Sequence, residues 1–284
     1  MNYRHAYHAG NHADILKHVV LTRAIEHLKK KAAPFRVFDA HGGIGVYDLG
    51  GVEAGKTFEW RNGVGRLFSD DGAAIALSDE AEGLLAPWRE SVAAANESGG
   101  LQRYPGSPEF ARVLLRSGDR LRLNELHPVD YETLLARYAR DNRAAVTRLD
   151  ALTFLKSQLP PPEKRGLILI DPPYEKTDEA VQAIRMLSEG LKRFATGVYC
   201  LWYPVTGDGT DRRMKDDAAS FGMKMVIAEL LVRPARPDGG LAGSGVIVVN
   251  PPWRLEEELG VLLPELAARL SQAEPSWSLE SAAL

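Results

Sequence analysis

Four short segments of the sequence each end in a carboxylate, and this pattern constrains the fold more than any other feature. The segments cover residues 35–39, 121–126, 145–149 and 167–170, and the acids at their ends are Asp39, Glu125, Asp150 and Asp171. Helical patterns lie between them, and strands that alternate with helices form an open, mostly parallel sheet. Ligands of such sheets bind beyond the carboxyl ends of the strands. The four acids are therefore expected to surround one ligand site.

The remaining elements complete an α/β architecture. Three further apolar segments, at 197–203, 224–232 and 245–249, bring the predicted sheet to seven strands. The N-terminal helix is expected to start after Asn11, a favourable capping residue, and to run to about Lys31. Another helix should start at Ser107, as its cap, with Pro108 in the first helical position.

The same pattern divides the chain into four parts. Residues 1–51 form an N-terminal arm, a helix, the first strand and a glycine-rich turn. Residues 52–100 are polar, rich in alanine and mostly helical in pattern, as expected for an inserted subdomain. Residues 101–273 complete the main domain, and the tail at 274–284 is predicted to be disordered.

Composition limits the protein class. Of the 284 residues, 45% are hydrophobic and 26% are charged, which is typical of a globular protein. No apolar run reaches the roughly 18 residues that a membrane span needs, and the polar N-terminus does not resemble a signal peptide. The single cysteine, Cys200, excludes an internal disulfide and is expected to be buried and inert. Together these features predict a cytoplasmic protein.

Charge is distributed unevenly along the chain. The net charge is −3, yet residues 1–36 carry seven Lys or Arg side chains and only two acids. This basic end is either a solvated helix face or a surface that contacts phosphates. Lys17 adjoins the apolar stripe of the first helix, where it either snorkels to water or faces a site.

The glycine-rich turn follows the first strand. The segment Asp39-Ala40-His41-Gly42-Gly43-Ile44-Gly45 resembles the cofactor turn of class I S-adenosylmethionine (SAM)-dependent methyltransferases, with His41 in place of the first glycine. Glycines here let the backbone approach a ligand closely. A nicotinamide dehydrogenase would need the G-x-G-x-x-G register with a helix beginning at once, and the sequence has neither.

Two further acids fit a cofactor of this kind. Glu125 ends the second strand and is expected to bind the ribose hydroxyls, although its distance from the turn requires an insertion between them. Asp150 ends the third strand and is placed to accept a hydrogen bond from the adenine amine of the cofactor. The alternative for each acid is a helix-capping or surface carboxylate.

The segment Asp171-Pro172-Pro173-Tyr174 carries the signature of methyltransferases that act on exocyclic amines. The adenine amino nitrogen is a poor nucleophile because its lone pair is delocalised into the ring. Asp171 and the Pro172 carbonyl can accept its two N–H bonds, and the prolines hold both acceptors in place. Asp171 can take the proton once the nitrogen is methylated, and Tyr174 can stack on the base.

A similar segment, Asn250-Pro251-Pro252-Trp253, ends the last strand. In methyltransferase topology that strand runs antiparallel to the others, so its end emerges at the opposite edge of the sheet. We therefore assign the chemistry to Asp171 and expect this second segment to be a stiff exit from the sheet, with Trp253 packed on the final helix.

The N-terminal arm contains several histidines, which suggest metal binding. His8 and His12 are four residues apart, but Gly10 and Asn11 interrupt any helix between them, and no carboxylate cluster completes a ligand set. The sequence therefore predicts no metal site. An arm that faces a base or a phosphate, with Tyr3 touching the target nucleotide, is the favoured alternative.

These segments, taken in order, resemble one family along essentially the whole chain. The matching motifs are NYRHAYHAGNHADILKH, DAHGGIGVY, YPGSP, ELHPVDY, RGLILIDPPYE, KRFATGVY, LWYP and NPPW. They are similar to those of the bacterial 23S rRNA adenine-N6 methyltransferase J family. The resemblance implies a monomeric, Rossmann-like class I enzyme with a small helical insertion. It also implies methylation of one adenine in domain V of 23S rRNA, on RNA that is protein-free or at an early stage of assembly.

The resemblance also implies roles for individual residues. Cofactor contacts fall on Lys17, His18, Asp39, His41, Gly42, Gly43, Ser107, Glu125, Asp150, Ala151 and Asp171. Asp171, Pro172 and Tyr174 carry the chemistry, and Tyr3 and Tyr174 contact the substrate RNA. Two other hypotheses stay open: a DNA adenine-N6 methyltransferase, and a non-catalytic RNA-binding protein on a methyltransferase fold.

Overall fold

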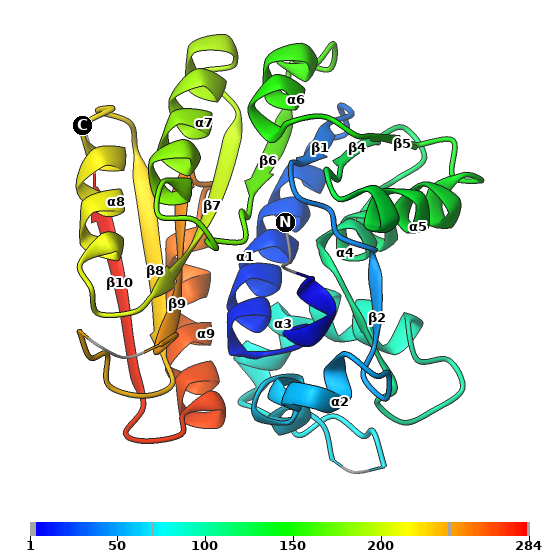
Figure 1. Ribbon diagram of the computed structural model, residues 1–284, viewed down its shortest axis with the longest axis vertical. Coiled ribbons are helices and arrows are strands. Elements are labelled where there is room, and N and C mark those ends of the chain that lie inside the picture. Colours follow the sequence, from blue (N-terminus) through cyan, green and yellow to red (C-terminus); the bar gives the residue numbers. More distant parts are fainter. Residues whose placement is uncertain (1–3, 70, 238–239, 283–284) are drawn as a thin grey trace.

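The computed structural model describes residues 4–69, 71–237 and 240–282. Its main sheet has eight strands in the order β10-β8-β9-β7-β6-β1-β4-β5, which runs from left to right in Figure 1. The strands are β1 (Arg36–Asp39), β4 (Arg120–Asn124), β5 (Ala144–Thr147), β6 (Gly166–Ile170), β7 (Val198–Val205), β8 (Met225–Leu231), β9 (Gly243–Val249) and β10 (Ser276–Ala282). All seven predicted strands are therefore present, and an eighth extends the sheet.

Strand direction agrees with the prediction. The strands β1, β4, β5, β6 and β7 are parallel neighbours. Strand β9 is antiparallel to both β7 and β8. The result is a mostly parallel sheet with its last predicted strand inverted.

The tail corrects one prediction. We expected residues 274–284 to be disordered, but Ser276–Ala282 form β10, which pairs antiparallel with β8. Leu279 packs against the core, and the hydroxyl of Ser278 donates to Glu229 on β8, at 3.0 Å. Strand β10 is held at the sheet edge by backbone hydrogen bonds to β8, so it needs few apolar side chains of its own. Its hydrophobic pattern is therefore weak.

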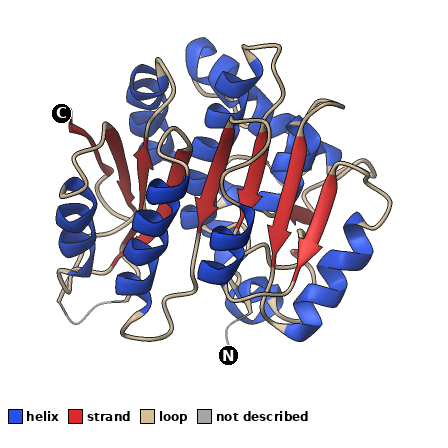
Figure 2. Ribbon diagram, turned by 90° about the horizontal axis from the view of Figure 1, so that it is seen from above, coloured by secondary structure: helices blue, strands red, loops and turns tan. Residues whose placement is uncertain are grey.

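Helices cover both faces of the sheet (Figure 2). One face carries α1 (His12–Lys29), α4 (Ser107–Leu114), α5 (Pro128–Tyr138) and α9 (Leu255–Leu270), and the other carries α6 (Ala151–Gln158), α7 (Glu179–Arg193) and α8 (Thr210–Ala219). Alternate residues of each strand enter opposite cores: Leu167 and Leu169 of β6 face α1, and Ile168 faces α7. The uncharged strands are thus buried on both sides, as in parallel sheets generally.

The segment 52–100 leaves the domain and returns to it through a small antiparallel pair of strands, β2 (Val46–Asp48) and β3 (Arg103–Pro105). It contains α2 (Ala54–Thr57), the 3-10 turns η2 (Glu59–Asn62) and η3 (Val64–Arg66), and α3 (Asp79–Ala94). Trp88 and Leu85 of α3 are fully buried in the same core as α1 and α4. The inserted helices therefore share the core of the main domain.

Helix ends follow the capping rules only in part. The side chain of Asn11 accepts hydrogen bonds from the backbone N–H groups of Ala13 and Asp14, as predicted for the cap of α1. Ser107 does not cap α4, because Gly106 occupies that position and the Ser107 hydroxyl donates to Asp39 instead.

Cys200 is buried on β7, and burial raises the pKa of its thiol to about 12, which agrees with an inert thiol.

Candidate active site

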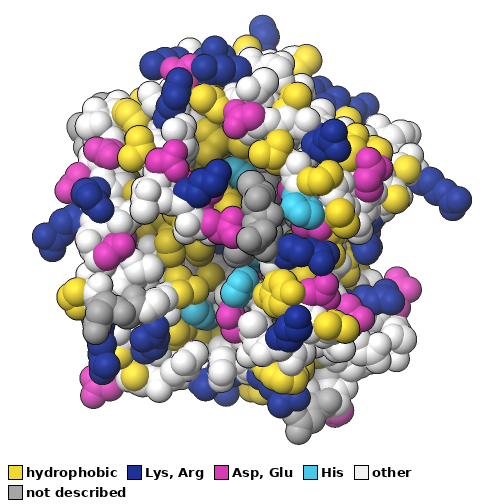
Figure 3. All heavy atoms as spheres, in the orientation of Figure 1, with side chains coloured by type: hydrophobic (Ala, Val, Ile, Leu, Met, Phe, Trp, Pro, Cys, Tyr) yellow, Lys and Arg dark blue, Asp and Glu magenta, His cyan; other side chains and the backbone are white. Residues whose placement is uncertain are grey.

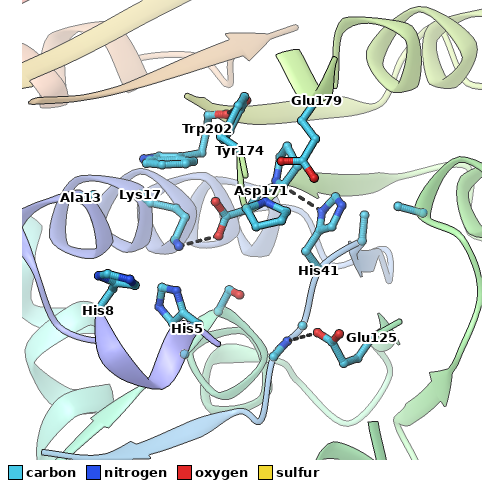
Figure 4. A pocket seen from close by; sticks show the side chains of 18 of the residues that line it. His5, His8, Ala13, Lys17, His41, Glu125, Asp171, Tyr174, Glu179 and Trp202 are labelled. Carbon is cyan, nitrogen blue, oxygen red and sulfur yellow. Dashed lines mark hydrogen bonds and ion pairs between the residues drawn. The ribbon is translucent and has the colours of Figure 1, made fainter. Parts of the chain in front are cut away.

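A cavity of about 710 Å³ lies at the carboxyl edge of the parallel strands, between the start of α1 and the ends of β1, β4 and β6. The predicted site residues that line it are Lys17, His18, His41, Gly42, Gly43, Ser107, Glu125, Asp150, Ala151, Asp171, Pro172 and Tyr174. These residues come from six separate stretches of the chain. Figure 4 shows several of them converging on the same space.

The glycine turn and Glu125 form one wall. Gly43 has φ +59°, and a Cβ atom there would lie 2.0 Å from the hydroxyl of Tyr47, so no other residue fits without rearrangement. The N–H of Gly43 donates to Glu125 Oε2 at 2.8 Å, and the N–H of His127 donates to Oε1 at 2.7 Å. Burial raises the pKa of Glu125. Both oxygens keep a lone pair directed elsewhere, which suits a carboxylate that receives hydroxyl groups.

Asp39 lies behind this wall and does not line the cavity. It is almost fully buried, accepts the His41 N–H through Oδ1 at 3.1 Å and accepts the Ser107 hydroxyl through Oδ2 at 2.6 Å. Burial raises its pKa to about 6. Asp39 therefore holds the turn and the start of α4 together, although the sequence predicts a cofactor contact.

His41 joins the glycine turn to the DPPY segment. Its Nδ1 atom accepts the backbone N–H of Asp171 at 3.2 Å, so the ring proton lies on Nε2 (Figure 4). Burial lowers the pKa of His41 to about 4, which keeps the ring neutral. An imidazole in the place of the first glycine of the turn thus fixes the backbone of the DPPY segment.

Lys17 approaches Asp171 from α1. Its Nζ atom lies 2.5 Å from Asp171 Oδ2 and 2.8 Å from Asp14 Oδ1. Lys17 and Asp14 are buried, and the two carboxylates raise the pKa of the lysine against the opposing effect of burial. Lys17 therefore faces the site and does not snorkel to water. The pair leaves Asp171 Oδ1 without a partner in the described residues.

Tyr174 closes the side of the cavity opposite Glu125. It has φ +53°, an unfavourable conformation for an aromatic residue, and its hydroxyl donates to the Trp202 carbonyl at 2.7 Å. The rings of Tyr174 and Trp202 meet edge to face, with centroids 5.4 Å apart. This bond fixes the tyrosine ring against the cavity.

His18 is buried at the base of the cavity. Its Nδ1 atom is 2.9 Å from the hydroxyl of Tyr104, and burial holds the pKa of the imidazole well below its usual range. Its Nε2 atom is buried and has no hydrogen-bond partner among the described residues. His18 therefore contributes its ring to the cavity wall, while this nitrogen is shielded from the cavity.

Asp150 and Ala151 begin α6 at the cavity edge. One oxygen of Asp150 accepts the N–H of Thr153 at 3.1 Å as the cap of the helix. The carboxylate is exposed, and its second oxygen has no hydrogen-bond partner among the residues that the structure describes. Capping and ligand binding, which we treated as alternatives in the sequence, are compatible here.

The cavity is also lined by residues that the sequence analysis did not assign to the site, among them His5, Asp14, Glu59 and Trp202. Asp14 accepts the N–H of Gly10 and lies 2.9 Å from the His5 ring. Trp202 lies within β7, and its place in the cavity wall follows from the pairing of β7 with β6. Tyr3 lies outside the described residues.

Among residues 4–69, 71–237 and 240–282, no group of His, Cys, Asp and Glu side chains is arranged to hold a metal ion. Within the same ranges, none of the helices is both long and apolar enough to cross a membrane.

Asn250 lies at the other edge of the sheet. Its side-chain amide donates to the carbonyls of Ala195 and Gly197, just before β7 begins, at 2.8 Å each. The prediction that this segment leaves the sheet away from the cavity is therefore confirmed. The predicted packing of Trp253 is wrong, because 80% of its surface is exposed.

Comparison with known proteins agrees with this geometry. A family model described as "Ribosomal RNA large subunit methyltransferase D, RlmJ" matches residues 32–282. The chain is 44% identical to the ribosomal RNA large subunit methyltransferase J of Escherichia coli (strain K12), over 96% of this chain and 95% of that protein. It is 40% identical to the protein of the same name from Haemophilus influenzae, over 99% and 98%. A crystal structure of a Legionella pneumophila protein superimposes with a TM-score of 0.85 at 33% identity, covering 96% of this chain and 98% of that one.

Proposed function

Because the chain belongs to the RlmJ family of ribosomal RNA large subunit methyltransferases, we propose that it methylates the N6 atom of one adenine in domain V of 23S rRNA. The family and the Rossmann-like fold make it an rRNA methyltransferase that uses SAM. The choice of base and of atom is our proposal. The observation that carries it is Asp171, which lines the cavity directly after the end of β6 and is followed by two prolines and Tyr174.

The cavity suits SAM in size and in polar groups, since small-molecule sites usually enclose about 300–1,000 Å³. Glu125 would hold the ribose hydroxyls, and Asp150 with Ala151 would hold the adenine. The backbone of Gly42 and Gly43 would lie against the methionine part, and the His18 ring would form part of the wall beside it. Bound SAM supplies an electrophilic methyl group.

Asp171 orients the nucleophile. The target amine donates one N–H to Asp171 Oδ1 and the other to the Pro172 carbonyl, which directs its lone pair at the methyl carbon. Lys17 holds the other oxygen of Asp171, and His41 holds its backbone N–H, so the acceptor is in place before the substrate arrives. When the N–C bond forms, the nitrogen becomes acidic and its proton passes to Asp171.

Tyr174 provides a flat surface for the target base. A base inside a helix cannot reach a cavity at the edge of the sheet, so the adenine is unpaired or extruded from its stack. Tyr3 would contact the same nucleotide from the N-terminal arm. We further propose that the enzyme acts as a monomer in the cytoplasm, on rRNA that is protein-free or in early assembly.

Transfer of a tritiated methyl group tests the proposal. Wild-type protein with labelled SAM should modify protein-free 23S rRNA and not duplex DNA of equal adenine content, and nuclease digestion should yield N6-methyladenosine. Label in DNA would favour the DNA adenine methyltransferase. Calorimetry that detects no SAM binding would favour a non-catalytic RNA-binding protein.

A further inference from the structure

Most of the positive charge of the basic N-terminal end is neutralised within the protein. Five of its seven basic side chains form ion pairs within the protein: Arg4 with Glu53, Lys17 with Asp14 and Asp171, Arg23 with Glu258, Lys29 with Glu26, and Arg36 with Glu163. A protein of net charge −3 that binds RNA needs a local basic surface. That surface must be sought elsewhere around the cavity.

The inserted segment presents such a surface, which we call the basic–aromatic patch: Tyr7, Lys56, Phe58, Trp60 and Arg61. The Lys56 ammonium lies 5.6 Å from the centre of the Tyr7 ring. The Arg61 guanidinium lies 4.7 Å from the Phe58 ring and 5.6 Å from the Trp60 ring. Figure 3 shows basic and hydrophobic side chains mixed over the region of α2, below the central hollow.

Phe58 is costly to the fold in two ways. It has φ +52° at the end of α2, a position where glycine is strongly preferred, and 44% of its surface is exposed. A strained backbone at an exposed aromatic residue is common at functional sites. Packing in the core explains neither property.

The charge of the patch faces outward. The two nearby carboxylates are engaged elsewhere, since Glu53 pairs with Arg4 and Glu59 bonds to His8 and Asn11. Within the part of the chain that the structure describes, no ion pair joins Lys56 or Arg61 to a carboxylate, and both side chains are exposed. The combination of two cations and an exposed ring is complementary to a nucleotide.

The patch adjoins the cavity. Glu59, between Phe58 and Trp60 in the chain, lines the cavity together with His8. The hydroxyl of Thr57 donates to the carbonyl of Tyr7, which fastens α2 to the N-terminal arm. A nucleotide on the patch would therefore be close to the one in the cavity.

We propose that the basic–aromatic patch binds an unpaired nucleotide of the RNA substrate next to the target adenine. Its base stacks on Phe58, and its phosphates contact Arg61 and Lys56. Single-stranded RNA is recognised in this way, through stacking on aromatic rings and cationic contacts to the backbone. The inference rests on the proposed function and extends it to the inserted segment.

Phe58→Gly separates binding from folding. It removes the ring and relieves the positive φ, so the melting temperature should be unchanged or higher. We expect the Kd for a fluorescent protein-free 23S rRNA transcript, measured by anisotropy, to rise about tenfold. The SAM affinity should not change, and the KM for RNA should rise more than kcat falls.

Phe58→Gly/Arg61→Gln should weaken binding further and reduce the slope of log Kd against log salt by about 0.7. Trp253→Ala/Arg254→Gln is the matched control, because it removes an exposed aromatic ring and an arginine at the opposite edge of the sheet. This control should bind RNA like the wild type.

The inference is overturned if the wild type methylates 23S rRNA and the Phe58 variants bind and methylate it as well as the control does. Wild-type protein that transfers no methyl group to rRNA would instead contradict the proposed function, and the inference with it.

Discussion

Two segments of this protein share four-letter patterns that differ only in their first and last residues, yet they lie at opposite edges of one sheet. Asp171-Pro-Pro-Tyr174 follows β6, which runs parallel to its neighbours, and Asn250-Pro-Pro-Trp253 follows the antiparallel β9. The positive φ falls on the last residue of the first segment and on the first residue of the second. Asn adopts this conformation far more readily than Tyr. The direction of the supporting strand, and not the local pattern, therefore decides which segment reaches the cavity.

The partners of the two leading side chains differ in the same way. Asp171 contacts a buried lysine and a neutral histidine from other elements, and its second carboxylate oxygen has no partner among the described residues. The side-chain amide of Asn250 donates to two backbone carbonyls. In the proposed function the first arrangement prepares an acceptor for a substrate, whereas the second stabilises the fold.

The largest expected effect is on catalysis. Asp171→Ala should lower the single-turnover rate of methyl transfer by about 10³-fold or more, because the acceptor and base are both lost. SAM affinity, measured by calorimetry, should change little. Asn250→Ala should transfer methyl groups at the wild-type rate, and a comparable loss in both variants would break the comparison.

Protonation of His41, at the cavity edge of the sheet, should make the stability of the protein depend on pH. Its pKa is lowered from 6.5 to about 4, so the folded state binds fewer protons than the unfolded state between these values. Stability associated with this group is full above pH 6.5 and is lost as the pH falls towards 4, by up to about 3 kcal/mol at 1.36 kcal/mol per unit.

His41→Asn keeps an acceptor for the Asp171 N–H and removes the titration. Urea unfolding at pH 7 and pH 4.5 should therefore show a smaller loss of stability in this variant than in the wild type. An equal loss of stability in the variant and the wild type would mean that another group causes the destabilisation at low pH.

The aromatic residues of the two segments should also differ. Tyr174→Ala removes the proposed stacking surface, and transfer should fall about 30-fold, in line with roughly 1–3 kcal/mol per stacked base. Trp253→Ala should leave kcat/KM for RNA unchanged, because its ring lies in solvent far from the cavity. Tyr174→Phe loses only the bond to Trp202 and should cost less than the alanine variant.

The smallest effect should be on stability. Asn250→Ala leaves the carbonyls of Ala195 and Gly197 without their donor, which should lower the free energy of unfolding by about 1–2 kcal/mol. Chemical denaturation measures this directly. A variant as stable as the wild type would show that water replaces the amide at this edge.

Much of the architecture could be predicted because it depends on short-range patterns. The seven core strands, the cap at Asn11 and the acids at the strand ends all follow from hydrophobic periodicity and local hydrogen bonding. Strand β10 could not be predicted in this way, because it is held mainly by backbone hydrogen bonds to its neighbour β8. Trp253 was misjudged for a related reason, since no local rule states whether a neighbouring helix will turn towards a ring.

For the site, the sequence by itself determined which residues could do chemistry: a carboxylate fixed by prolines, an aromatic neighbour and a glycine turn after a strand. The tertiary structure decided how they work together. His41 reaches the backbone of Asp171 across 130 residues, and Lys17 reaches its carboxylate across 154. Asp39 lies behind the cavity wall, whereas Asp14 and Trp202 line the cavity. Local propensity fixes the elements, but such contacts exist only once the sheet has packed against its helices, and that packing depends on the whole chain.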